Sequence, residues 1–97
     1  MKITTKDNFN IDVNPERAKD WRFVKALAMM DSEDESEKLK GATFAVPFLL
    51  GKDGEARLME HLTDKDGLVS SAAVLAAFTE IINLLGEEEK KSSSSLE

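Results

Sequence analysis

Residues 69–86, VSSAAVLAAFTEIINLLG, form the segment that the rest of the chain is expected to cover. Four large apolar side chains recur on one face at helical spacing: Val74, Phe78, Ile81 and Leu85. Leu75 and Ile82 widen this stripe, and alanines fill much of the remaining surface. A helix with so little polar surface is normally covered on most sides, by its own domain or by a second chain. The segment therefore predicts packing rather than chemistry.

The ends of this helix carry recognisable signals. A hydroxyl at Ser70 or Ser71 is suited to accept a hydrogen bond from an unpaired amide of the first turn. Gly86 is expected to end the helix, because glycine adopts the left-handed conformation that helix ends commonly use. We therefore predict a helix over residues 70–85. Residues 87–97 contain almost no apolar side chain, and we expect a disordered tail there.

The composition limits the size and class of the protein. The chain has 97 residues, enough for one domain, which we place at residues 1–86. Its net charge of −6 argues against binding nucleic acid or an anionic membrane surface. Cysteine is absent, which excludes disulfides and thiolate chemistry. With no membrane-spanning run and no secretory signal in the pattern, we expect a cytoplasmic protein.

The first residues alternate polar and apolar side chains and predict a β-hairpin over residues 2–13. Ile3 and Thr5 come from the first strand, residues 6–8 (KDN) supply the turn, and Phe9 and Ile11 come from the second. Two strands are marginally stable alone, so this hairpin must lie against helices or pair with another chain.

Three further helices are predicted between the hairpin and residue 69. The first covers residues 15–30 and starts at Asn14-Pro15. Its expected inward face carries Trp21, Val24 and Ala28, with Phe23, Leu27 and Met30 beside them, while Arg17, Lys19, Arg22 and Lys25 stay outside. The second covers residues 36–50, which contain Pro47, expected to kink or restart it. Gly51 to Gly54 reads as a turn, and a short helix follows at residues 55–62. The predicted fold class is α+β and mostly α: a hairpin followed by a bundle of about four helices.

The chain contains no segment that matches a known catalytic or metal-binding pattern. The acidic residues 31–37 (DSEDESE) lack the glycine and ligand spacing of a calcium loop, and we interpret them as a solvated linker. His61 stands alone among charged neighbours near a helix end, with no serine suitably placed for a catalytic triad. We therefore predict no enzyme activity, no catalytic residue, no cofactor and no metal site.

The order of several short motifs resembles the small tail assembly chaperones of long-tailed phages and prophages of Gram-positive bacteria. The motifs are Asp20-Trp21, residues 48–51 (FLLG), residues 60–62 (EHL), residues 66–70 (DGLVS), residues 79–81 (TEI) and residues 90–95 (KKSSSS). The resemblance covers nearly the whole chain. Each motif is weak alone, and it is their order that carries the likeness.

This resemblance implies a function that consists of protein–protein contact. Such chaperones coat the tape measure protein, a long and hydrophobic client, during tail assembly and leave before the tail is complete. Their gene precedes that of the tape measure protein, and a programmed frameshift often makes a longer second product. Lys90-Lys91 could lie on a slippery run of adenines in the gene, a hypothesis that the codons would test.

The apolar residues left over from the predicted core give the candidate partner-binding face. They are Phe48, Leu49, Leu75, Phe78, Ile82 and Leu85. An amphipathic client helix lying in a groove is the expected binding mode, with self-association of the chaperone along the client. The alternative is that these residues simply meet in the core of a monomer. An alternative function is a structural head–tail component, or a general interaction module, that stays in the particle.

Overall fold

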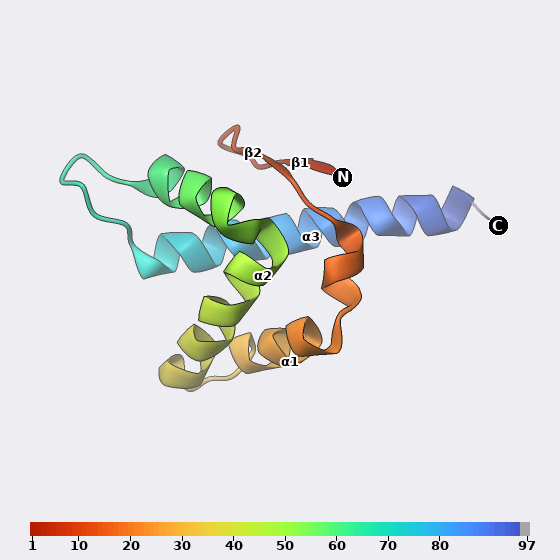
Figure 1. Cartoon of the computed structure of the whole chain (residues 1–97), viewed down its shortest axis with the longest axis horizontal. Helices are drawn as coiled ribbons and strands as arrows, with labels where there is room; N and C mark the ends of the chain where they lie inside the picture. The colour runs from red at the N-terminus through yellow and green to blue at the C-terminus, as the bar shows by residue number, and fades with distance from the viewer. Residues whose placement is uncertain (96–97) are drawn as a thin grey trace.

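The computed structural model describes residues 1–95 of the chain, and the side chains of residues 1–89. The elements follow in the order β1 (Lys2–Thr4), β2 (Asn10–Asp12), the 3-10 helix η1 (Pro15–Lys19), α1 (Trp21–Met30), α2 (Glu35–Leu62) and α3 (Ser71–Ser95). Figure 1 shows α3 running along the long axis of the molecule, with its last turns extending past the other elements. The predicted class, mostly helical with an N-terminal hairpin, is confirmed.

The N-terminal hairpin forms as predicted within residues 2–13. Its strands are antiparallel, and Ile3 lies opposite Ile11 with both side chains buried. The turn is closed by a hydrogen bond from the Asn8 amide to the Thr5 carbonyl, at 3.0 Å. Asn8 has a φ of 66°, a left-handed conformation that asparagine tolerates better than most residues. Because both isoleucines point to the helices, the hairpin contributes one wall of the core.

The segment predicted as one helix over residues 15–30 consists of two helical elements instead. Asn14 caps η1 by accepting from the Glu16 amide, as the sequence predicts. Asp20 then has extended backbone angles and caps α1 by accepting from the Arg22 amide at 2.8 Å. An aspartate side chain satisfies the free amides of a new first turn well, which explains why the chain restarts there.

The face of α1 that enters the core also differs from the prediction. Phe23 and Ala26 are buried, whereas Trp21 is 72% exposed and Val24 is 42% exposed. Both faces of α1 are apolar, so periodicity could not choose between them. The choice is made by α2, because the buried backbone of Gly41 lies against Ala26 and allows a close helix crossing.

The second and third predicted helices, residues 36–50 and 55–62, are one element. Helix α2 continues through Pro47 and changes direction at Gly51, whose backbone angles are φ 77° and ψ 169°. The bend therefore falls at the first residue of the predicted turn over residues 51–54, but a single glycine makes it, and the described residues contain three α-helices rather than four. Glycine alone adopts such angles without steric cost.

Helix α3 starts as predicted and ends later. The Ser70 hydroxyl caps it by accepting from the Ala73 amide at 3.3 Å, and Phe78, Ile81 and Leu85 are buried. The helix passes through Gly86 to Ser95, so it extends beyond the predicted end at residue 85 and into the segment for which the sequence predicts disorder. A glycine inside a helix costs only about 1 kcal/mol relative to alanine, and the glutamates and lysines that follow favour helix. Residues 96–97 of the predicted tail lie outside the described part.

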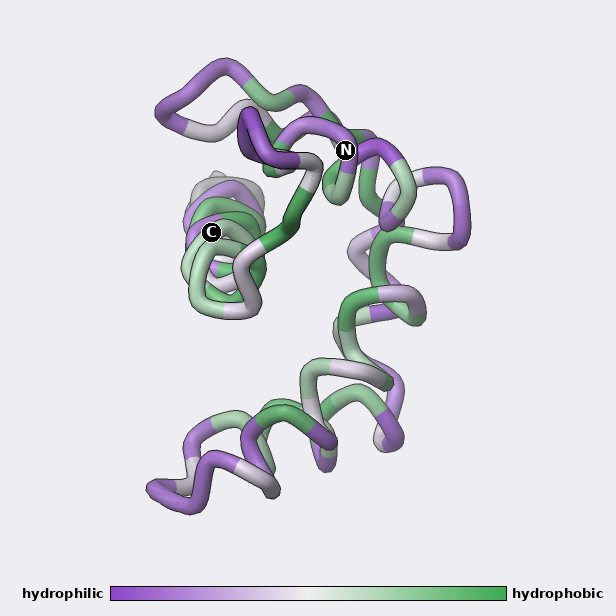
Figure 2. Tube along the Cα trace, turned by 90° about the vertical axis from the view of Figure 1, so that its left-hand side faces the viewer, coloured by the Kyte–Doolittle hydropathy of each residue, from purple (hydrophilic) through white to green (hydrophobic). Residues whose placement is uncertain are grey.

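The core lies where all the elements meet. Rings from three helices form its centre: Phe23 of α1 lies 6.1 Å from Phe48 of α2 and 6.4 Å from Phe78 of α3, measured between centroids. Figure 2 looks along α3 and shows the hairpin, α2 and α1 following one another around it. The exposed positions of α3 carry small or polar residues, among them Ala72, Ala76, Thr79 and Asn83. Phe78, Ile81 and Leu85 are buried, whereas Leu75, Ile82 and Leu84 are half-buried, so α3 is covered along the stripe that the sequence predicts.

Candidate partner-binding surface

The structure does not bring the six predicted partner-binding residues together on one outer face. Leu49, Phe78 and Leu85 are buried in the core, with no surface to offer a partner in this conformation. Phe48, Leu75 and Ile82 are half-buried. Ile82 packs against the core, and Phe48 is enclosed by other side chains, so Leu75 remains as the predicted residue best placed for contact.

Leu75 lies in an apolar groove between the two longest helices, here named the α2–α3 groove. The groove has a volume of about 150 Å³ and is lined by Leu39, Ala42, Thr43, Val46, Glu55, Met59, Ser71, Val74 and Leu75. Leu39 is 39% exposed and forms part of its rim. A second hollow, beside Met30 and Lys38, also has Leu75 in its wall. The two hollows therefore meet at Leu75, on the side of α3 that faces α2.

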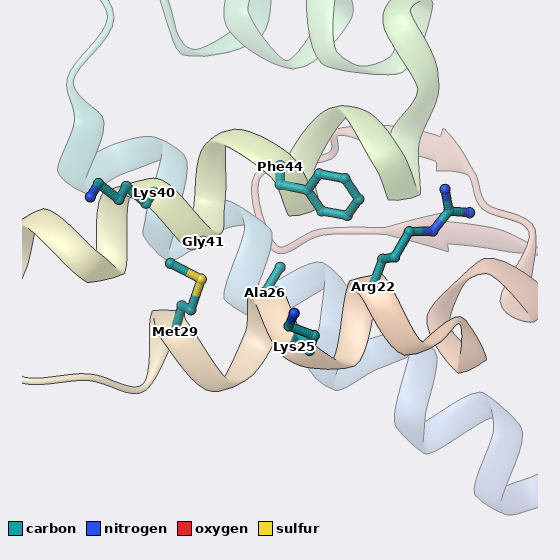
Figure 3. A pocket seen from close by; sticks show the side chains of 7 residues that line it. All are labelled: Arg22, Lys25, Ala26, Met29, Lys40, Gly41 and Phe44. Carbon is teal, nitrogen blue, oxygen red and sulfur yellow. The ribbon is translucent and has the colours of Figure 1, made fainter.

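A second groove lies between α1 and the first half of α2, here named the α1–α2 groove. It has a volume of about 160 Å³ and is lined by Arg22, Lys25, Ala26, Met29, Lys40, Gly41 and Phe44. Figure 3 shows Ala26, Met29 and Phe44 between the two helices, with Lys40 at one end of the groove and Arg22 at the other. The lining combines apolar groups with three cationic side chains and contains no acidic residue.

The outer side of α1 adds an exposed apolar strip. Trp21, Val24 and Ala28 follow one another at helical spacing and are all exposed, and we call them the α1 strip. The sequence places these three residues on one face correctly, but this face points to solvent rather than into the core. An exposed tryptophan is notable, because tryptophan is among the residues that most often dominate protein–protein contacts.

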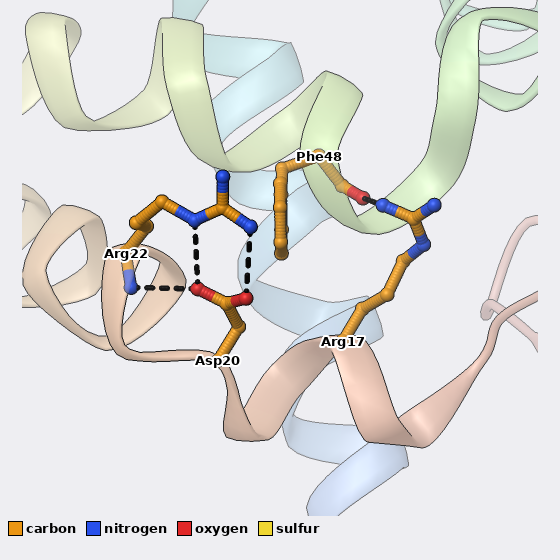
Figure 4. A network of polar contacts seen from close by, with 4 residues as sticks. All are labelled: Arg17, Asp20, Arg22 and Phe48. Atoms are coloured by element: carbon orange, nitrogen blue, oxygen red, sulfur yellow. Dashed lines mark hydrogen bonds and ion pairs between the residues drawn. The ribbon is translucent and has the colours of Figure 1, made fainter.

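A polar network holds α1 against α2 next to this groove (Figure 4). The guanidinium of Arg22 makes two hydrogen bonds to the Asp20 carboxylate, at 3.1 and 3.0 Å. These hydrogen bonds, together with the Arg22 amide, hold the pKa of Asp20 below its ordinary value of 3.8. Arg17 and Arg22 lie on either side of the Phe48 ring, each 5.2 Å from its centroid, and Arg17 donates to the Phe48 carbonyl at 3.1 Å.

His61 has a partner that links the hairpin to the end of α2. Its Nε2 lies 2.8 Å from Asp7 Oδ2, and the Thr5 hydroxyl donates to the other oxygen of Asp7 at 2.6 Å. These two hydrogen bonds, that of Thr5 foremost, hold the pKa of Asp7 below its usual range. The hollow beside His61 is lined by Asn8, Phe9, Asn10, Arg57 and Glu60, which include no nucleophilic hydroxyl. The arrangement fastens the hairpin to α2.

One of the acidic residues between α1 and α2 caps a helix with its side chain. Asp34 accepts from the Ser36 amide at 3.0 Å and caps α2, and Ser32 accepts from the Asp34 amide. Across the described part of the chain, no three histidine or acidic side chains lie together in a way that could hold a metal ion. A search of the same residues finds no helix that is long and apolar enough to cross a membrane.

Sequence reasoning missed most of the surface residues that the structure singles out. No local pattern in the sequence marks Leu39, Phe44, Lys25 or Lys40 as a residue that lines a surface groove. One signal was available: residues 21–30 contain eight apolar residues, two cations and no acid. Such a helix cannot be covered on all sides by so small a domain.

Comparison of this chain with models of protein families, with curated proteins and with solved structures finds no match.

Proposed function

We propose that this chain is a non-enzymatic tail assembly chaperone of a phage or prophage, and that its client is the tape measure protein. The order of sequence motifs suggests the family and the client. The observation that best supports client binding is the α2–α3 groove, which is apolar and open beside Leu39 and Leu75. A chaperone for a hydrophobic helical client needs such a surface, because it must cover the apolar face of the client in water.

The position of Leu75 makes it the central contact in this proposal. It lines both the α2–α3 groove and the neighbouring hollow, so a client helix lying along the two hollows would cover it from both sides. Leu39 and Met59, from two different parts of α2, line the same groove and widen the contact. Covering each half-exposed aliphatic side chain contributes about 1 kcal/mol, so affinity for a long client would come from several chaperone copies.

The test is capture of the client by a variant with a charge in the groove. The chain and the tape measure protein encoded directly downstream would be produced together, and the soluble complex quantified by affinity capture. We expect Leu75→Glu to weaken capture by about tenfold or more, because an unpaired carboxylate would then lie against apolar side chains. Ala72→Glu is the matched control, because Ala72 is exposed on the same helix and does not line the groove.

The possible results distinguish an error in the proposed function from an error in the proposed binding site. If the unmodified chain does not capture the tape measure protein, the proposed function is wrong. If it does, and Leu75→Glu captures as well as Ala72→Glu with equal thermal midpoints, the α2–α3 groove is not the client site. Finding the chain in purified, finished phage particles would instead favour the alternative function, a structural head–tail component.

A further inference from the structure

We propose that the α1–α2 groove and the adjoining α1 strip form a second docking site, which binds an acidic amphipathic helix of a partner protein. This site shares no lining residue with the α2–α3 groove. On α2 the two grooves use different faces: residues 40, 41 and 44 line one, and residues 39, 42, 43 and 46 line the other. The proposal therefore does not depend on the tape measure protein being the client.

The first argument is the composition of α1. Eight of its ten residues are apolar, and only Arg22 and Lys25 are polar. The domain buries one side of this helix, through Phe23 and Ala26, and leaves Trp21 72% exposed on the other. A helix that is apolar on nearly all sides is normally covered on nearly all sides, so this outer face is suited to a partner.

The second argument is the shape of the groove. A Cβ atom at Gly41 would lie 2.4 Å from the Ala26 carbonyl oxygen, so the two helix backbones approach closely and form a shallow floor. Met29 and Phe44 rise beside this floor, and Phe44 is 40% exposed. The volume of about 160 Å³ gives room for one apolar anchor of roughly the size of a benzene ring. A leucine or phenylalanine on one face of a partner helix meets this requirement.

The third argument is charge. Lys25 on α1 and Lys40 on α2 stand on the two helices that border the groove (Figure 3). Within the described residues, neither ammonium takes part in an ion pair. Arg22 is already neutralised by Asp20. The chain as a whole has a net charge of −6, so this cationic border is a local departure from its acidic surface. The matching occupant carries carboxylates on the flanks of its apolar face.

The concave shape favours a protein helix over an anionic lipid surface, which offers the same negative charge. The floor at Ala26 and Gly41 lies between two helices, where a narrow helix with one projecting side chain can reach it and a flat bilayer surface cannot.

The test uses Trp21, the single tryptophan of the chain, as its reporter. The probe is a synthetic peptide helix with leucine at helical i, i+3 and i+7 positions and glutamate on both flanks. A second peptide has lysine in place of each glutamate. We expect the glutamate peptide to shift Trp21 emission to the blue as it covers the indole, with an affinity that falls as salt is added. The lysine peptide should cause no shift.

Matched variants locate the contact. The double variant Lys25→Glu/Lys40→Glu should bind the glutamate peptide about tenfold more weakly or worse, because two attractive pairs become repulsive. Lys52→Glu/Lys65→Glu makes the same change in net charge at exposed lysines outside the groove and should bind normally. Anisotropy of a labelled peptide measures affinity without relying on Trp21, and circular dichroism checks that each variant is folded.

Several results would overturn the proposal. These are no emission shift with the glutamate peptide, equal binding of the lysine peptide, or equal weakening in the two double variants. Vesicles of phosphatidylserine that shift Trp21 emission as the peptide does would indicate a lipid-binding surface instead. A blue shift that rises with protein concentration alone, together with a dimer in sedimentation, would show that a second copy of this chain occupies the groove.

Discussion

Asp20 shows how much one residue contributes to the arrangement of its neighbours. Its backbone amide donates to the Arg17 carbonyl at the end of η1. Its carboxylate caps α1 and fixes the Arg22 guanidinium beside the Phe48 ring. The sequence predicts none of these roles, because Asp20 lies inside a segment that reads as one continuous helix. The caps at Asn14 and Ser70 could be predicted, since each directly precedes an apolar helical pattern.

The lowered pKa of Asp20 leads to a prediction about acid stability. The carboxylate is bound more favourably in the folded protein than in the unfolded chain, so its contribution is complete above the ordinary pKa of 3.8. As the pH falls through and below that value the carboxylate is protonated, and the contribution is lost. As the pH falls through and below 3.8, we expect the free energy of unfolding of the unmodified chain to decrease towards that of the Asp20→Asn variant. Asparagine keeps the cap but not the charge.

The measurement is urea unfolding of the two proteins at neutral pH and at about pH 3, followed by circular dichroism. Asp12→Asn is a useful comparison. The pKa of Asp12 is also lowered, by a hydrogen bond from the terminal amino group, but Asp12 caps no helix. This account would be contradicted if Asp20→Asn and the unmodified chain differed in free energy of unfolding by the same amount at both pH values.

At the scale of the elements, the crossing of α1 and α2 decides which surfaces the protein presents. The crossing is close because Gly41 has no side chain to separate Ala26 and Met29 from α2. From the sequence alone, Gly41 only weakens the prediction of a helix, because nothing there shows that it will contact α1. The close crossing turns Phe23 inward and Trp21 outward, so it also creates the α1 strip.

Substitution of this glycine should therefore be costly. Gly41→Ala places a Cβ atom within 3 Å of the Ala26 carbonyl and of the Met29 Cβ, and the helices must separate. We expect a loss of about 1–3 kcal/mol in the free energy of unfolding, as is usual for overpacking. Gly86→Ala is the control, because Gly86 lies in α3 with open space around its Cα. That change should raise stability by up to about 1 kcal/mol, through helix propensity alone.

Chemical denaturation of the two variants measures both effects. Equal stability changes of the same sign would mean that intrinsic helix propensity decides both positions, and that the contact at Gly41 is unimportant. In addition, Gly41→Ala should alter the emission of Trp21 if the crossing controls the exposure of the α1 strip.

At the scale of the whole molecule, the hairpin is part of the core rather than an attachment to it. Ile3, Phe9, Ile11 and Val13 are buried with residues of α2 and α3. Polar contacts also cross from the hairpin to the helices: the Lys6 amide donates to Glu80 at 2.7 Å, and Asp7 pairs with His61. The polar contacts are exposed, whereas the apolar ones are not, so the apolar contacts should carry the stability.

The relative size of these contributions can be measured. Ile11 is buried against Gly54: a Cβ atom added at Gly54 would lie 3.0 Å from the Ile11 Cδ1. Truncation of Ile11 therefore leaves a cavity beside a residue that has no side chain to fill it. We expect Ile11→Ala to cost about 2–5 kcal/mol. Asp7→Asn should have a much smaller effect, and that effect should shrink in high salt. Thermal unfolding at two salt concentrations compares them, and a larger loss from Asp7→Asn would contradict the assignment.

The sequence by itself determined the hairpin, the caps at Asn14 and Ser70, and the apolar stripe of α3, because each rests on local periodicity or on one side chain next to its own backbone. Only the tertiary structure decided which face of α1 is buried, that Gly51 alone bends α2, and that Leu75 stays accessible while Phe78 does not. These outcomes depend on contacts between residues far apart in the chain. Where both faces of a helix are apolar, only the shape of its neighbour selects the buried one.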